Sequence, residues 1–203
     1  MSKYQKNDEN GPRSGYEPPY DPDRFNGNPE IQDVHNCWDY AMDVIDFAQL
    51  NQCTKGSRNC EPRFHQPGGT KGLSNILQDA DGRSCKVVDY LMRQDVPDLA
   101  RTTFERKCPS GTSKIALVVH PGEDYHFYRQ DPDGYWSHKD GANKVKRFDA
   151  KGHLIKNPKT AARNYRSKGS FLNYTDFCGF YCAPRRKTIK LSRGGSRKGK
   201  KLQ

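Results

Sequence analysis

The chain has 203 residues, of which 33% are hydrophobic, and its 18 Gly and 13 Pro predict one domain with a modest core and many loops. Its formal net charge is +11. No apolar run approaches the ~18 residues of a membrane helix, and no hydrophobic segment follows the charged N-terminal residues. We therefore expect no membrane span and no secretory signal, and predict a cytosolic protein.

Composition divides the chain into consecutive parts. We predict an N-terminal extension over residues 1–30, a folded domain over 31–183 and a basic tail over 184–203. Within the domain, residues 51–72 resemble an inserted loop that could shape a substrate cleft. Two cysteines of this loop, Cys53 and Cys60, could also be joined by a disulfide.

The segment from residue 35 to 50 predicts a helix that begins at a cysteine. Asn36 is a favourable N-cap, and Asp39 in the first turn suits the positive end of the helix dipole. Apolar residues then recur at three- and four-residue steps, at Ala41, Val44, Ile45 and Ala48. Cys37 thus falls at the first helical position, where unpaired N–H groups lower a thiol pKa and favour a nucleophile. The alternative is a cysteine that is simply packed in the core.

Six further cysteines make the total of 7 odd, so at least one thiol stays unpaired. We expect most of them to be buried as small hydrophobic side chains or to form a few disulfides. No Cys-x-x-Cys pair occurs, and the spacings match no common zinc motif. A zinc site remains a minor alternative, with ligands drawn from Cys53, Cys60, His65 and Cys85.

Two short aromatic segments flank a Pro-Asp-Gly turn near the middle of the chain. The alternation in 124–130 and in 134–139 predicts two strands of a hairpin, the first with His126 and the second with His138. The hairpin brings the two histidines near each other on one sheet face. We predict that His126 accepts the thiol proton of Cys37 as general base and that His138 fixes the tautomer of His126.

The remaining segments are less informative. Residues 114–122 predict a strand that ends in a turn, and residues 173–184 predict a final strand with Cys178 and Cys182 in the core. The other histidines have no partner that the sequence suggests. We expect them at the surface or as caps: His35, His65, His120 and His153.

The Cys37 segment, NCWDYA, is similar to the nucleophile segment of the CHAP (cysteine–histidine amidohydrolase/peptidase) domains. The twelve-residue step from His126 to His138 is similar to the NlpC-like hydrolases, whose third catalytic residue is often His. The chain therefore resembles the papain-like fold, and also uncharacterised proteins of large DNA viruses and bacteria. The resemblance implies an α+β fold, in which the nucleophile helix packs on an antiparallel sheet.

An acyl-transfer enzyme also needs donors for the oxyanion that forms on the substrate. The backbone N–H of Cys37 is one candidate, because it lies at the positive end of a helix. The side chain of Gln32 or Asn36 is the candidate for the second donor.

The tail carries nine Lys or Arg and no acid, which leaves about +2 of the net charge of +11 for the rest of the chain. Without apolar periodicity it predicts a disordered arm, suited to nonspecific contact with nucleic acid through counterion release. The same composition is equally typical of a nuclear address or a solubilising tail. The residues that would make this contact are Arg185, Arg186, Lys187, Lys190, Arg193, Arg197, Lys198, Lys200 and Lys201.

These features together predict a cysteine hydrolase that cleaves an amide bond of a peptide, protein, isopeptide or peptidoglycan substrate, without metal or organic cofactor. The main alternative is a non-catalytic structural component, such as a minor capsid or DNA-associated virion protein with capsid proteins as partners. For either function we expect a cytoplasmic location, with a virion-associated or nuclear location as the alternative. A third alternative is a zinc-binding module that uses Cys37, His126 and His138 as ligands.

Overall fold

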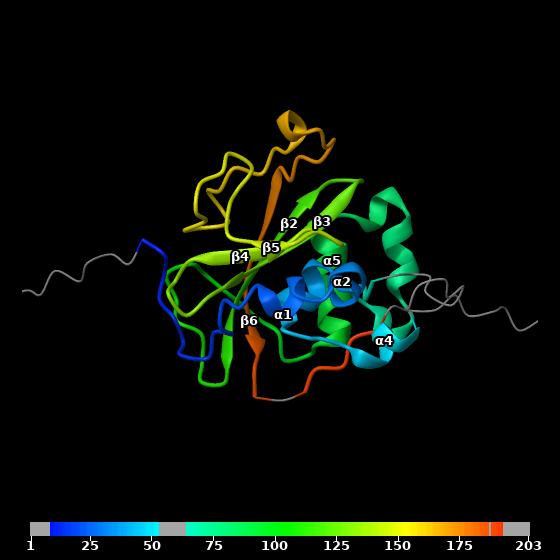
Figure 1. Cartoon of the computed structure of the whole chain (residues 1–203), viewed down its shortest axis with the longest axis horizontal. Helices are drawn as coiled ribbons and strands as arrows, with labels where there is room; N and C mark the ends of the chain where they lie inside the picture. The colour runs from blue at the N-terminus through cyan, green and yellow to red at the C-terminus, as the bar shows by residue number, and fades with distance from the viewer. Residues whose placement is uncertain (1–8, 53–63, 187, 193–203) are drawn as a thin grey trace, which may run out of the picture.

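The computed structural model describes residues 9–52, 64–186 and 188–192. These residues form a six-stranded sheet of strand order β1-β6-β2-β3-β4-β5, in which every neighbouring pair is antiparallel (Figure 1). The strands are β1 (Ala100–Thr102), β2 (Thr112–His120), β3 (Asp124–Gln130), β4 (Trp136–Lys139), β5 (Val145–Lys146) and β6 (Asp176–Pro184). The predicted α+β class is confirmed.

Short helices accompany the sheet. The α-helices are α1 (Asp23–Asn26), α2 (Pro29–Val34), α3 (Cys37–Met42), α4 (Phe47–Gln52) and α5 (Cys85–Asp95). Short 3-10 helices occur at η1 (Gly69–Lys71), η2 (Ser74–Gln78), η3 (Ala80–Gly82) and η4 (Arg166–Lys168). In the part of the chain that the structure describes, no helix has the length and apolar character needed to cross a bilayer.

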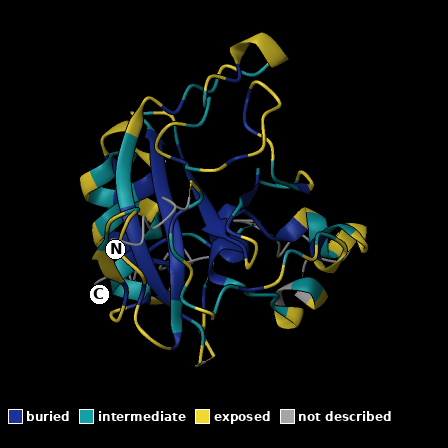
Figure 2. Ribbon diagram, turned by 90° about the vertical axis from the view of Figure 1, so that its left-hand side faces the viewer, coloured by how far each residue is buried: buried dark blue, intermediate teal, exposed yellow. Residues whose placement is uncertain are grey.

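The central strands of the sheet are buried on both faces, and Figure 2 shows most of the strand length in dark blue inside the molecule. The first core lies between one face and helices α3 and α5, and contains Trp38, Leu91, Leu117 and Phe127. The second core lies on the opposite face, where the irregular segment 147–175 packs on the strands. It contains Val118, Tyr128, Trp136, Ile155 and Phe180. Strand β2 contributes to both cores, which explains its continuous apolar sequence.

The predicted hairpin is confirmed. Strands β3 and β4 pair with Tyr128 opposite His138, so that residues 126 and 138 lie on the same face. The turn closes through hydrogen bonds between Asp131 and Tyr135 and between Gly134 and Asp131. Gly134 has a φ of 91°, a conformation that glycine adopts at little cost.

The helix that begins at Cys37 is shorter than the apolar period predicts. It ends at Met42, because Asp43 has a left-handed φ of 61°. The Asp43 carboxylate accepts hydrogen bonds from Arg24 and from the buried Arg129, which hold it in this conformation. Tertiary contacts therefore override the local period, and the chain resumes as a helix only in α4.

Both terminal parts contribute more to the fold than their sequences predict. In the N-terminal extension, Phe25 is fully buried, and the buried Lys114 donates to the carbonyl of Pro12. In the basic tail, Leu191 is only 8% exposed and packs in the first core. The folded body therefore extends beyond the expected boundary at residue 183, because apolar side chains among the tail cations pack on the core.

Among the described residues, four cysteines form two disulfides, Cys85–Cys178 and Cys108–Cys182. A register shift beside Leu117 turns Cys178 toward the first core and α5. The pairing removes Cys85 from the alternative zinc set. Cys53 and Cys60 lie outside the described residues.

Candidate functional site

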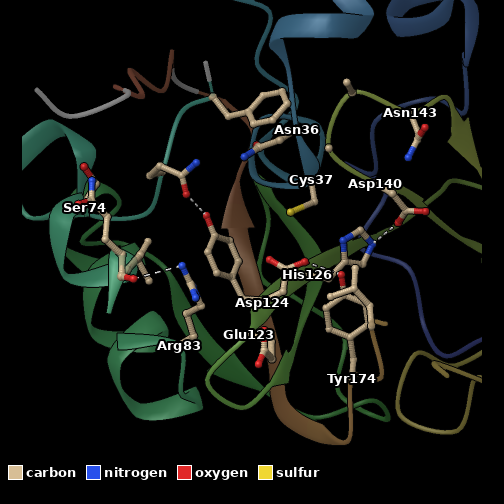
Figure 3. A pocket seen from close by; sticks show the side chains of 18 residues that line it. Asn36, Cys37, Ser74, Arg83, Glu123, Asp124, His126, Asp140, Asn143 and Tyr174 are labelled. Carbon is tan, nitrogen blue, oxygen red and sulfur yellow. Dashed lines mark hydrogen bonds and ion pairs between the residues drawn. The ribbon is translucent and has the colours of Figure 1, made fainter. Parts of the chain in front are cut away.

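Cys37 occupies the first position of α3 and lines a pocket of about 560 Å³ (Figure 3). The Asn36 side chain accepts from the backbone N–H groups of Trp38 and Asp39, and the Asp39 carboxylate accepts from the Asn36 N–H. This capping box fixes the helix start, as the sequence predicts. Cys37 is 6% exposed, and the backbone N–H of Phe127 on β3 faces its sulfur closely enough to favour the thiolate.

The electrostatic expectation for Cys37 is wrong. Burial, with a further contribution from the Asp124, Asp140 and Asp39 carboxylates, raises the pKa of the thiol well above its ordinary value, and the Phe127 N–H only partly offsets this. A helix of six residues provides too little positive potential to outweigh the loss of solvation. The resting side chain is therefore a neutral thiol.

His126, His138 and Asp140 form a compact cluster, here called the His–Asp triangle. The Nε2 atom of His126 lies 2.8 Å from Nδ1 of His138 and 3.2 Å from Oδ1 of Asp140. Nδ1 of His138 lies 3.0 Å from the same oxygen. The predicted proximity of the two histidines is confirmed, while Asp140 is a member that sequence reasoning missed. The alternation of β4, continued past its last residue, places Asp140 on the face of His138 and could have revealed it.

The hydrogen bonds determine which ring nitrogen of His126 is free. His138 Nε2 donates to the backbone carbonyl of Phe148 at 3.0 Å, because a carbonyl can only accept. In a neutral His138 ring, Nδ1 then carries a lone pair, and His126 Nε2 donates its proton to it. His126 Nδ1 is therefore unprotonated. In Figure 3 this nitrogen is on the side of the ring that faces Cys37.

Burial fixes the charge states of the triangle. It lowers the pKa of His126 to about 3, although the Asp140 carboxylate acts in the opposite direction. Burial alone would raise the pKa of Asp140, but its contacts with His138 and His126 and the nearby Lys146 ammonium outweigh this effect and lower that pKa. At neutral pH, His126 is thus a neutral base beside an ionised carboxylate.

The two side chains predicted as oxyanion donors, Gln32 and Asn36, already donate hydrogen bonds to backbone carbonyls. The Gln32 side-chain amide donates to the carbonyl of Ala142 at 3.0 Å. Asn36 lines the pocket, but its amide donates to the carbonyl of His65 at 2.9 Å, and its oxygen caps α3. The backbone N–H of Cys37 remains as the predicted donor.

Lys139 links the two halves of the site, and the sequence did not reveal this role. Its buried ammonium donates to the carbonyls of Gln32 and His35, each at 2.6 Å, and of Gly141 at 2.7 Å. Burial lowers its pKa to about 8. The ammonium thereby connects the segment before Cys37 to the turn that carries Asp140.

The described part of the predicted insertion forms one wall of the pocket. Phe64 and Gln66 line it, and the hydroxyl of Tyr125 donates to the Gln66 side-chain oxygen. On another side, the Tyr174 hydroxyl donates to the Asp124 carboxylate at 2.7 Å. The expectation that this insertion shapes a cleft agrees with these positions.

Two histidines expected at the surface are buried. His35 donates from Nδ1 to the carbonyl of Ile31 and accepts from the backbone N–H of Asp46 at Nε2. His65 is 2% exposed and pairs with the buried Asp39 carboxylate through Nδ1. His65 therefore has a structural partner behind the nucleophile and is not available for the alternative zinc set.

The described tail cations differ in their surroundings. The Arg185 guanidinium donates to Ser113 Oγ and to the carbonyl of Ala41, both at 2.8 Å, and burial lowers its pKa to about 9. Arg185 is thus part of the folded body rather than an arm, whereas Lys190 is exposed. Arg186, also exposed, donates to the Tyr16 hydroxyl. The remaining predicted contacts lie outside the described residues: Lys187, Arg193, Arg197, Lys198, Lys200 and Lys201.

The His–Asp triangle has the composition of a metal site. Among the described residues, His126, His138 and Asp140 form a group whose possible ligand atoms all lie within 4.8 Å of one another. Cys37 does not belong to this group. The ligand set therefore differs from the predicted zinc alternative, which joined Cys37 to the two histidines.

Comparison with known proteins gives one informative relative. The chain is 34% identical over 161 residues to insoluble matrix shell protein 1 of Ruditapes philippinarum, and the match covers 79% of this chain and 86% of the relative. No family model matches the chain, and no solved structure matches it.

Proposed function

The chain belongs to the same family as insoluble matrix shell protein 1 of Ruditapes philippinarum, and we propose that it is a cysteine hydrolase that cleaves an amide bond of a peptide or protein. Cys37 is the nucleophile, and His126 is the general base. His138 and Asp140 orient His126. The proposal includes a papain-like arrangement, in which the start of the nucleophile helix meets a strand that carries the base.

One observation carries the proposal, namely the hydrogen-bond pattern from which the tautomer of His126 follows. The Phe148 carbonyl fixes the proton of His138, and His138 in turn accepts the Nε2 proton of His126. His126 Nδ1 therefore offers its lone pair in the pocket that Cys37 lines. A purely structural histidine would use both nitrogens for buried hydrogen bonds, as His35 does.

The proposed reaction has two acyl-transfer steps. As the Cys37 sulfur attacks the substrate carbonyl carbon, its proton moves to His126 Nδ1. The same proton then passes to the leaving amine, the C–N bond breaks, and a thioester on Cys37 remains. Water, deprotonated by His126, attacks the thioester and releases the carboxylic acid and the thiol. Asp140 stabilises the imidazolium that forms transiently on His126.

The raised pKa of Cys37 affects the mechanism rather than excluding it. In the resting site both the thiol and the His126 ring are neutral, since the pKa of the ring is lowered to about 3. Proton transfer therefore accompanies nucleophilic attack and does not precede it. A substrate that replaces pocket water also removes the solvent that competes for the thiol proton.

The two disulfides support an oxidising compartment as the place of action. Disulfides persist in secreted proteins and are rare in the reducing cytosol. The relative is named as a shell matrix protein, which agrees with an extracellular location for this chain. We therefore favour this location over the cytosolic, nuclear or virion-associated locations that the sequence suggested.

The relative's name also favours a second candidate function, a non-catalytic structural component of an insoluble matrix. Under this alternative, the protein has the same fold, and the neutral thiol of Cys37 is only a buried side chain. The His–Asp triangle then contributes to stability alone. The two candidates differ in whether Cys37 reacts.

Acylation by p-nitrophenyl acetate distinguishes these candidates. We expect one equivalent of p-nitrophenol to be released rapidly and mass spectrometry to find the acetyl group on Cys37. The His153→Ala variant, which removes an exposed histidine outside the site, should react like the wild-type protein. The His126→Ala variant should react at least about 100-fold more slowly. Equal rates in folded wild-type and His126→Ala proteins would favour the structural component.

A further inference from the structure

We infer that the His–Asp triangle also binds a divalent transition-metal ion, with Zn²⁺ as its probe, and that the bound ion switches off His126 as a base. The metal site is independent of catalysis, whereas the inhibitory effect rests on the proposed hydrolase function. Its ligands are His126 Nε2, His138 Nδ1 and Asp140 Oδ1.

The distances within the triangle suit a metal ion. The three ligand atoms are separated by 2.8, 3.0 and 3.2 Å. Two ligands in a tetrahedral zinc site, each about 2.0–2.1 Å from the metal, lie roughly 3.3 Å apart. The atoms therefore need to separate by only a few tenths of an ångström. Two imidazoles and a carboxylate are also a ligand set that Zn²⁺ and related ions accept.

With both imidazole rings neutral, a single proton cannot satisfy all three contacts of this arrangement. If His126 Nε2 donates to His138 Nδ1, the lone pair of that nitrogen still faces the Asp140 carboxylate at 3.0 Å. If His138 instead donates to Asp140, its Nδ1–H cannot accept the proton of His126. A cation bound by all three atoms removes this conflict, because each atom then directs a lone pair at it.

The surroundings orient the ligands as metal sites require. His138 is fully buried, and its Nε2–H donates to the Phe148 carbonyl at 3.0 Å, which directs Nδ1 into the triangle. Such outer hydrogen bonds are typical of metal-bound histidine. His126 and Asp140 line the pocket, so an ion can enter and a water or substrate atom can complete its coordination.

One nearby cation opposes metal binding. Lys146 Nζ forms an ion pair with the second oxygen of Asp140, and its side chain is 36% exposed. The ammonium reduces the negative potential that the metal would experience. It also provides a sensitive test, because its replacement should strengthen metal binding without touching a ligand.

The inhibitory effect follows from the two nitrogens of one ring. In the proposed reaction, His126 needs its proton on Nε2 and its lone pair on Nδ1. A metal on Nε2 displaces that proton, and the neutral ring then carries it on Nδ1. Nδ1 can no longer accept the proton of Cys37.

The test is a calorimetric titration of the full-length, chelator-treated protein with Zn²⁺. We expect one ion per chain for the wild type and for the His153→Ala and Cys37→Ser controls. Asp140→Asn should weaken binding at least about tenfold, and Lys146→Met should strengthen it severalfold. Absence of a single site in the wild type, or its loss in Cys37→Ser, would overturn the inference. So would unchanged affinity in Lys146→Met, which keeps the test valid if Asp140→Asn does not fold.

Failure of the metal-site inference can be distinguished from failure of the proposed hydrolase function. If Cys37 is acetylated in the presence of chelator but the protein binds no Zn²⁺, the metal-site inference fails and the hydrolase proposal stands. If Zn²⁺ binds at the triangle but Cys37 is not acetylated, the metal site stands and the hydrolase proposal fails. If both occur, saturating Zn²⁺ should suppress acetylation, and Asp140→Asn should need at least tenfold more Zn²⁺ for the same effect.

Discussion

Two histidine–aspartate groups with buried imidazole rings belong to this part of the fold, and they differ in how completely the ring nitrogens are hydrogen-bonded. Behind the nucleophile, His65 pairs with Asp39 through Nδ1 and approaches Asp46 at 3.4 Å through Nε2. On the pocket side, His126 uses only Nε2 within the His–Asp triangle. Both rings are 2% exposed, so burial does not separate them.

The difference indicates which group stabilises and which reacts. Asp39 also accepts from the Asn36 N–H, so the pair of His65 and Asp39, here called the His65 pair, completes the cap of α3. The triangle instead leaves His126 Nδ1 as a base beside the pocket. We therefore expect changes at the His65 pair to alter stability and changes at the triangle to alter chemistry.

The largest expected effect compares the two histidines directly. His126→Ala should lower the rate of Cys37 acetylation by about 10²–10⁴-fold, because a positioned general base contributes that much. His65→Ala should lower it by less than about tenfold in molecules that remain folded, since the ring does not line the pocket. Stopped-flow release of p-nitrophenol, corrected for the folded fraction, measures both. An equal loss in folded His65→Ala would abolish the distinction.

The second prediction concerns the free energy of unfolding instead of the acetylation rate. Asp39→Ala should lower the free energy of unfolding by about 3–5 kcal/mol, because it leaves His65 without its buried partner and removes half of the capping box. Asp140→Ala should cost only about 1 kcal/mol, since its side chain is 25% exposed. Urea unfolding measures both, with Asp81→Ala as an exposed control. A larger loss for Asp140→Ala than for Asp39→Ala would reverse the assignment.

Local sequence patterns were sufficient to predict most of the residues on the pocket side of this comparison. The N-cap at Asn36 and the alternation around the Pro-Asp-Gly turn depend on neighbouring residues, so the sequence revealed the positions of Cys37, His126 and His138. The α+β class followed from the same elements. Asp140 was within reach of that reasoning, because it shares the face of His138 two residues away.

The His65 pair, the end of α3 and the pKa of Cys37 depend instead on contacts between distant segments. His65 is 26 positions from Asp39, in a segment that had the composition of a loop. The early end of α3 depends on Arg129, which is 86 positions from Asp43. The raised pKa of Cys37 reflects burial by the whole domain. No local period records such contacts, which is why the sequence predicted a thiolate where the structure has a thiol.

The third prediction separates the contributions of His138 and Asp140 to the acetylation rate. His138→Ala should slow acetylation by about tenfold, less than His126→Ala, because Asp140 Oδ1 at 3.2 Å can still accept the Nε2 proton. The double variant His138→Ala/Asp140→Ala should lose more than the product of the single effects, since no acceptor is left to hold the tautomer. A double-mutant cycle on the acetylation rate measures this coupling. Strictly multiplicative effects would show that the two residues act independently.

The smallest expected effect is the pH dependence of the wild-type rate. Burial lowers the pKa of His126 to about 3 and raises that of Cys37 above its ordinary value. Between pH 5 and 8 the base is therefore already deprotonated and the thiol is still protonated, so the acetylation rate should change by less than about threefold.

Without the base, only thiolate reacts, and the rate of His126→Ala should rise about tenfold for each pH unit. His65→Ala should keep the flat profile, because the base and the thiol of the pocket are unchanged. A wild-type rate that climbs in parallel with His126→Ala would mean that the thiol reacts unaided, and the triangle would then be as structural as the His65 pair.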